Sequence, residues 1–193
     1  SSESLDWLNS EMEEELDANL LTGDDEFGAI LPDQCQDAEN LAIELLASRA
    51  CTAHELKKKL QGKRIPLKTI DAVISDFKTR GLINDCLYAE TYSRSKWSSS
   101  CWGPSRIKQG LFKKGVTAAD ADKAIKLVFN DGGDHDSGIG LSRLSLDQLY
   151  LQASKQWKRS TCVPLEKRKS RIIQWLQYRG FNWAVIGYLL KKL

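Results

Sequence analysis

The sequence lacks the features that define membrane, disulfide-rich and metal-binding classes. No apolar run approaches the roughly 20 residues that a membrane helix needs. The five cysteines are odd in number and show no C-x-x-C spacing, which argues against a disulfide framework or zinc site and favours a reducing compartment. Neither of the two histidines has an evident nucleophile partner, and no phosphate-binding glycine loop is present. We expect no catalytic residue, cofactor or metal.

Lysine and arginine are absent from residues 1–48, which hold 14 of the 26 acidic residues. We interpret residues 1–37 as a flexible acidic N-terminal tail, because this composition opposes packing. One hypothesis is that the tail lies over the rest of the chain and competes with its partner. The alternative is simple disorder.

All 28 basic residues lie in residues 49–193, against 12 acidic ones, a formal charge of +16. Such a body favours a polyanion or an acidic protein surface as partner. The alternative is a solvated helical surface, although solvated surfaces usually mix both signs of charge.

One spacing frame occurs three times in this basic part. An apolar residue is followed by a leucine four residues later, then by a turn residue and another apolar residue. The copies span 56–65, 107–116 and 172–181, with offsets of 51 and 65 residues that also align Lys63 with Lys114 and Arg179. A recurring frame of this kind predicts stacked repeats.

Each copy predicts three helices, with no strand-like alternation. Caps such as Thr52, Asn84, Pro164 and Asn182 mark helix starts, and the serines at 98–100 predict a break. We therefore predict an all-α protein of three tandem three-helix repeats in an elongated, curved molecule with an acidic N-terminal extension. The predicted segments are the tail over 1–37, repeat 1 over 38–84, repeat 2 over 85–129, a Gly/Asp-rich loop over 130–144, and repeat 3 over 145–193. The spacing of the loop residues Asp131, Asp134, His135 and Asp136 fits neither the EF-hand pattern nor a His-x3-His helix site, so we expect no metal there.

Basic residues surround the apolar stripe of each second helix, which would place cations at intervals along a stack and suit a long, negatively charged partner. Trp102 is expected to be exposed, where it would either stack on a base or anchor a protein interface. The candidate binding residues are Lys57, Lys58, Lys63, Arg64, Arg94, Lys96, Trp102, Arg106, Lys108, Lys113, Lys114, Lys167, Arg168, Arg171 and Arg179.

Three motifs carry a resemblance to a known family. They are GLIND at 81–85, GPSRI at 103–107 and KGV at 114–116. Together with Glu55-Leu56 and Gly180-Phe181 in the flanking repeats, they resemble RecX regulatory proteins over residues 38–193. The resemblance implies a modulator of the RecA recombinase that lies as a curved clip in the groove of the RecA filament on DNA. It also implies limits on filament growth, ATP hydrolysis and strand exchange, with Arg106 and Lys114 as the matching basic positions.

The chain departs from the family pattern at several positions. Serines stand at 98–100 where the family has basic residues, and Arg64 stands where a turn glycine is expected. The resemblance implies a RecA-type filament and single- and double-stranded DNA as partners, no membrane, a monomer, and a soluble intracellular protein that is cytoplasmic by family norm. The acidic tail, the insertion and the missing initial Met suggest, as an alternative, a chloroplast or mitochondrial member with its transit peptide removed.

Two other functions remain open at this stage. A DNA- or RNA-binding helical module acting without RecA would bind naked DNA tightly, with a steep dependence on salt. For a purely structural scaffold, reversal of Arg106, Lys108 and Lys114 to Glu would change nothing except solubility.

Overall fold

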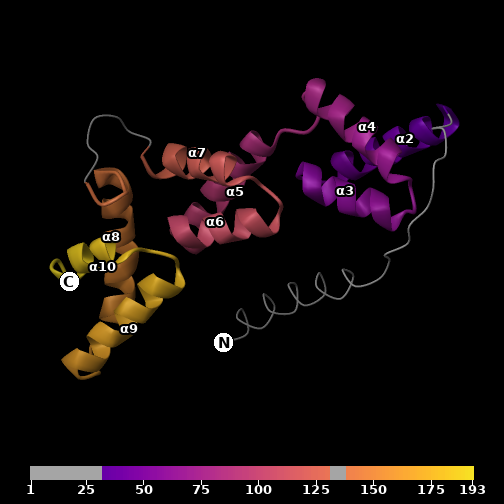
Figure 1. Ribbon diagram of the computed structural model, residues 1–193. Helices are drawn as coiled ribbons and strands as arrows, with labels where there is room; N and C mark the ends of the chain where they lie inside the picture. Colours follow the sequence, from indigo (N-terminus) through magenta and orange to yellow (C-terminus); the bar gives the residue numbers. More distant parts are fainter. Residues whose placement is uncertain (1–31, 131–137) are drawn as a thin grey trace. The chain divides into compact units, whose positions relative to one another are not determined.

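The computed structural model describes residues 32–130 and 138–193, and within these ranges every regular element is an α-helix (Figure 1). The first repeat contains α2 (Pro32–Ser48), α3 (Ala53–Gly62) and α4 (Leu67–Thr79). The second contains α5 (Asp85–Ser100), α6 (Pro104–Lys113) and α7 (Ala118–Phe129), and the third contains α8 (Arg143–Lys158), α9 (Leu165–Tyr178) and α10 (Trp183–Leu190). The prediction of an all-α chain of tandem three-helix repeats is confirmed. None of the described helices is long and apolar enough to cross a membrane.

Short polar side chains begin five of these helices. In each case an oxygen of the N-cap side chain accepts a hydrogen bond from the backbone N–H three residues further on, which satisfies a donor that the helix itself leaves unpaired. These N-caps are Thr52, Asn84, Thr117, Ser142 and Asn182.

The repeated frame corresponds to equivalent positions of α3, α6 and α9. Lys63, Lys114 and Arg179 are the C-cap residues of these helices. The next residue adopts a left-handed backbone in all three, with φ of 61° at Arg64, 76° at Gly115 and 85° at Gly180. The departure at position 64 therefore leaves the turn unchanged, and an arginine adopts the conformation that glycine takes in the other two repeats.

The buried side chains form two clusters. One belongs to the first repeat and is built around Leu56, Leu60 and Phe77. The other is shared by α5 to α10. It includes the equivalent pairs Ile107 with Leu111 and Ile172 with Leu176, and the buried side chains of Phe129 and Leu149. The second and third repeats thus share one core, whereas the first repeat has its own.

The predicted break at residues 98–100 is wrong, because α5 continues through Ser100. Ser98 and Ser99 donate their hydroxyl hydrogen bonds back to the carbonyl of Ser95, so these side chains do not need to leave the helix. Trp97 holds the same turn in place by packing on Phe129, with ring centroids 5.0 Å apart. The helix ends instead at Cys101, whose φ is 55°.

Some predicted boundaries differ from the helix bounds. Helix α2 begins at Pro32, so residues 32–37 of the predicted tail are helical, and α8 begins at Arg143 rather than 145. The rest of the tail lies outside the described residues, as do Asp131, Asp134, His135 and Asp136. Ser142 N–H donates to the carbonyl of Phe129, which brings the two ends of the predicted loop together.

Candidate functional site

Two candidate lysines are held in equivalent ion pairs. Lys57 on α3 lies 3.0 Å from Asp71 on α4, and Lys108 on α6 lies 2.7 Å from Asp122 on α7. The offset of 51 residues carries one pair onto the other. The third repeat has Ile173 and Gly187 at the corresponding positions, so it lacks the pair. A phosphate would compete with a carboxylate for either lysine. Arg94 is paired in a similar way with Glu90, 3.0 Å away.

Arg106 is engaged by two aromatic rings from different repeats. Its guanidinium carbon lies 4.1 Å from the centre of the Trp102 ring and 4.2 Å from the centre of the Tyr178 ring. Its two terminal nitrogens donate to the Tyr178 carbonyl and hydroxyl, both at 3.3 Å. Arg106 therefore joins the second repeat to the end of α9, which gives this residue an internal role.

Trp102 does not occupy the exposed position that the sequence predicted. It is half-buried in the shared core of the second and third repeats. The Lys96 ammonium lies 4.6 Å from the centre of its ring, in addition to the Arg106 guanidinium. Trp102 is thus a platform for two of the protein's own cations, and contacts of this kind contribute about 0.5–2 kcal/mol each.

Arg168 closes the turn between α8 and α9. Its Nε and Nη2 atoms donate to the Trp157 carbonyl at 3.0 and 2.8 Å, and its guanidinium stacks 4.0 Å from the centre of the Trp157 ring. These contacts satisfy a carbonyl at the end of α8. The side chain is therefore directed into the fold rather than toward an external anion.

Arg179 is half-buried and stacks on Trp175 at 4.2 Å. Burial lowers the pKa of its guanidinium, although a nearby thiol at Cys101 acts in the opposite direction. Its Nε atom is buried and has no hydrogen-bond partner within the described part of the chain. Sequence reasoning identified Arg179 as basic but not as partly desolvated.

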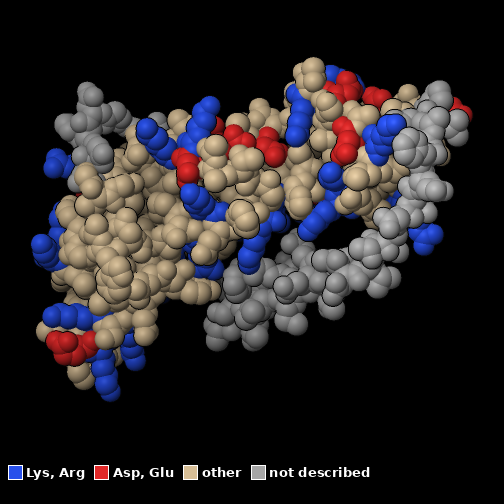
Figure 2. Space-filling model, viewed as in Figure 1, with Lys and Arg blue, Asp and Glu red and all other residues tan. Residues whose placement is uncertain are grey.

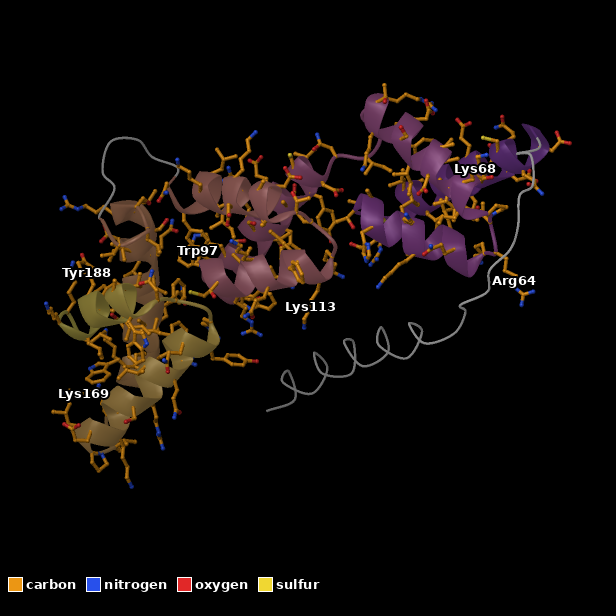
Figure 3. All side chains as sticks on the ribbon, viewed as in Figure 1. Arg64, Lys68, Trp97, Lys113, Lys169 and Tyr188 are labelled. Atoms are coloured by element: carbon orange, nitrogen blue, oxygen red, sulfur yellow. The ribbon has the colours of Figure 1, made fainter. Side chains whose placement is uncertain are left out.

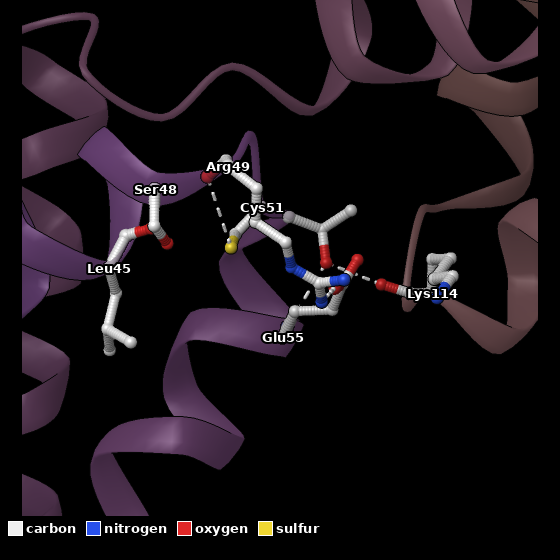
Figure 4. A network of polar contacts seen from close by, with 7 residues as sticks. Leu45, Ser48, Arg49, Cys51, Glu55 and Lys114 are labelled. Carbon is white, nitrogen blue, oxygen red and sulfur yellow. Dashed lines mark hydrogen bonds and ion pairs between the residues drawn. The ribbon is translucent and has the colours of Figure 1, made fainter. Parts of the chain in front are cut away.

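The backbone carbonyls of Lys114 and Arg179 have a second role at the junctions between repeats. Thr52 Oγ1 donates to the Lys114 carbonyl at 2.6 Å (Figure 4). Gly103 N–H donates to the Arg179 carbonyl at 2.5 Å. The repeat offsets align Thr52 with Gly103 and Lys114 with Arg179. The start of α3 thus contacts the end of α6, and the start of α6 contacts the end of α9. The aligned spacing was visible in the sequence, but the contact was not predicted.

The remaining candidates lie on the surface of the first, second and third repeats. Figure 2 shows lysine and arginine side chains over all three repeats, with acidic side chains gathered mainly over α4 and α7 in this view. Arg64 extends from the α3–α4 turn and Lys113 from the end of α6 (Figure 3). The exposed candidates without an ion pair to any described residue are Lys58, Lys63, Arg64, Lys167 and Arg171.

Comparison with known proteins gives a separate match for each of the three repeats. The RecX first three-helix domain matches residues 38–77, the second matches residues 84–125, and the third matches residues 145–190. The three matches leave out residues 1–37, 78–83, 126–144 and 191–193.

Curated relatives agree with these domain matches. The regulatory protein RecX of Lactococcus lactis subsp. lactis (strain IL1403) is 28% identical over 162 residues, which cover 83% of this chain and 56% of the relative. The regulatory protein RecX of Clostridioides difficile (strain 630) is 27% identical over 171 residues, covering 88% of this chain and 74% of the relative. The chain thus spans little more than half of the Lactococcus relative that it matches.

A solved structure has a similar arrangement of helices. The crystal structure of RecX from Lactobacillus salivarius superposes with a TM-score of 0.73 at 27% identity, covering 84% of this chain and 98% of that chain. Since all three domains match in sequence and in order, and the fold agrees, the chain belongs to the RecX family.

Proposed function

We propose that this chain is a non-catalytic regulator that binds a RecA-type recombinase filament on DNA as a monomer. Binding limits filament extension, ATP hydrolysis and strand exchange, and so modulates recombination and repair. The observation that carries the proposal is the presence of all three RecX domains in sequence. A molecule of stacked helices with cations on successive repeats suits a long, regular nucleoprotein partner better than a small ligand.

The exposed cations support a contact with phosphate at two places. Lys58, Lys63 and Arg64 lie on or just after α3, and Lys167 and Arg171 lie on α9. None of these five forms an ion pair with a described residue, so a phosphate would not have to displace a carboxylate. They are better DNA-contact candidates than Lys57, Lys108, Arg106 or Arg168, whose side chains have internal partners.

The direct test is DNA-dependent ATP hydrolysis and strand exchange by a RecA-type recombinase while this protein is titrated in. We expect both activities to fall with added protein. The double variant Lys167→Ala/Arg171→Ala should require a higher concentration for the same inhibition. Full recombinase activity at saturating wild-type protein would reject the proposal.

The second candidate function is a nucleic-acid-binding module that acts without a recombinase. The exposed cations on α3 and α9 favour it, because they would meet naked DNA equally well. Cosedimentation separates the two functions. The regulator should sediment with recombinase–DNA filaments and bind naked DNA weakly, whereas the independent module should bind naked DNA tightly, with affinity falling steeply as salt rises.

A further inference from the structure

An open groove of about 1150 Å³ lies between α5 and α8. One wall presents the hydroxyl groups of Ser95, Ser98 and Ser99, and the other presents the amides of Gln148, Gln152 and Gln156. No aspartate or glutamate is among the described residues that line it. The serines that depart from the family's basic residues thus form one wall of this groove.

The two walls suit a chain of peptide groups. The Ser98 and Ser99 hydroxyls donate to the Ser95 carbonyl, so they offer acceptors to peptide N–H groups. The carboxamides of the other wall both donate and accept, as a peptide backbone requires. The three glutamines are four residues apart on α8, so their side chains recur about every 6 Å along the helix. Alternate residues of an extended polypeptide recur about every 6.6–6.8 Å, so successive glutamines can meet peptide groups on the same side.

One glutamine already shows how the wall is held in place. Gln148 Oε1 accepts a hydrogen bond of 3.2 Å from Nε1 of Trp97, whose ring also lines the groove. This contact fixes the carboxamide and leaves its NH₂ group as a donor. Trp97 and Trp175 add apolar surface to the lining of the groove.

The charges in the groove indicate what kind of chain fits. Arg94 is paired with Glu90, which leaves Arg179 as the lining arginine without an ion pair to any described carboxylate. Its Nε atom is buried without a partner, although the guanidinium stacks on Trp175. A partly desolvated guanidinium is a strong site for one carboxylate. A nucleic acid would require a series of cations along the groove, and these are lacking.

We propose that the α5–α8 groove binds an extended polypeptide segment with an acidic side chain, which Arg179 receives. That this segment belongs to the recombinase rests on the proposed function. The exposed cations of α3 and α9 would then meet DNA, so protein and nucleic acid would be bound by different surfaces of the same chain.

The test uses the full chain and two probes. The first is a set of fluorescein-labelled overlapping peptides that tile the recombinase sequence, and the second is a labelled oligothymidylate. The variant Ser99→Trp places an indole in the groove from an exposed position on α5. Ser75→Trp makes the same change at an exposed position on α4, outside the groove, and serves as the matched control.

We expect at least one acidic peptide to bind wild type and Ser75→Trp equally and Ser99→Trp about tenfold more weakly or worse, a loss of about 1.4 kcal/mol. Gln152→Ala should weaken the same peptide in the same direction. Oligothymidylate binding should be equal in all four proteins. Circular dichroism melting identifies any variant that fails to fold. If Ser99→Trp does not fold, the peptide affinity of Gln152→Ala decides the test.

Two results would overturn the proposal. One is that no peptide binds, or that every peptide binds Ser99→Trp as well as wild type. The other is that Ser99→Trp loses oligothymidylate, which would make the groove a nucleic-acid site. Inhibition of strand exchange by wild-type protein is measured separately. The proposal that the groove binds a peptide can therefore be rejected while the proposed function stands.

Discussion

Thr52 Oγ1 both accepts a hydrogen bond from the Glu55 N–H and donates one to the Lys114 carbonyl, at 3.1 and 2.6 Å. One hydroxyl thus caps α3 and joins the first repeat to the end of α6. The equivalent junction between the second and third repeats uses the Gly103 N–H and the Arg179 carbonyl. Because the first repeat has its own core, polar contacts of this kind carry much of its attachment to the second.

Replacement of Thr52 by Val should therefore affect more than a helix cap. Loss of an N-cap costs about 1 kcal/mol, and loss of the part-buried hydrogen bond to the Lys114 carbonyl costs about 1–2 kcal/mol more. We expect a fall of about 2–3 kcal/mol in the free energy of unfolding, measured by urea denaturation. Thr52→Ser keeps the hydroxyl and is the control. Equal stability of Thr52→Val and Thr52→Ser would show that the junction hydrogen bond contributes nothing.

The junction glycines predict a large cost for an added methyl group. At Gly180 a Cβ would collide with the backbone nitrogen of Arg106, and at Gly115 it would collide with the His54 Cβ, which is bonded directly to the backbone. Both positions also have positive φ, which costs about 1–2 kcal/mol for a residue other than glycine. Neither obstructing atom can move aside without a shift of its backbone. We expect Gly180→Ala and Gly115→Ala each to destabilise by about 3 kcal/mol or more.

The same two variants provide an internal comparison. Thermal unfolding followed by circular dichroism gives both values under one set of conditions. If either variant loses no more than the roughly 1–2 kcal/mol expected from its positive φ, the collision at that glycine adds no cost.

Arg64 is the natural counterpart of these glycines. Its left-handed conformation costs about 1–2 kcal/mol, and glycine would remove this cost while adding about 0.5–1 kcal/mol of unfolded-state entropy. We expect Arg64→Gly to raise the free energy of unfolding by about 0.5–1 kcal/mol. Arg64→Ala loses the charge but keeps the strain, so it should leave stability unchanged. A drop in stability for Arg64→Gly would mean that the arginine side chain makes a stabilising contact.

Much of the fold could be predicted from the sequence because its determinants are local. Caps such as Thr52 and Asn182, and apolar spacing such as Leu56 with Leu60, act within one or two helical turns. The lysine–aspartate pairs were also accessible, because Lys57 and Asp71 have the same separation as Lys108 and Asp122. The serine run was misread because a serine hydroxyl can bond back to its own helix, which composition alone does not reveal.

The site was harder to predict because it depends on contacts between distant residues. Arg106 and Tyr178 are 72 positions apart, and no spacing rule joins them. The sequence identified the basic residues but could not separate Arg171, which is exposed, from Arg106, which lies between two rings. Charge patterns give the sign of a surface, whereas tertiary packing decides which cations remain available.

A pH effect is expected at Cys101, where burial raises the pKa of the thiol to about 11 from an ordinary value of 9.0. The folded state therefore favours the protonated thiol. Its contribution to stability is complete below pH 9 and is lost as the pH rises toward 11. In Cys101→Ala this part of the pH dependence should vanish. Urea unfolding of both proteins from pH 8 to 11 tests this. Parallel curves would rule out Cys101 as the group responsible.

Arg106 and Arg171 occupy equivalent places in the repeat frame and should respond oppositely to the same substitution. Arg106→Ala removes two ring contacts and two hydrogen bonds, and should lower the free energy of unfolding by about 1–2 kcal/mol. Arg106→Lys should recover part of this loss. Arg171→Ala should leave stability within about 0.5 kcal/mol of wild type but reduce the salt dependence of DNA binding by about one phosphate contact. A salt titration of DNA affinity beside urea unfolding measures both. If Arg171→Ala proved as destabilising as Arg106→Ala while leaving the salt dependence unchanged, exposure would be a poor guide to which cations meet DNA.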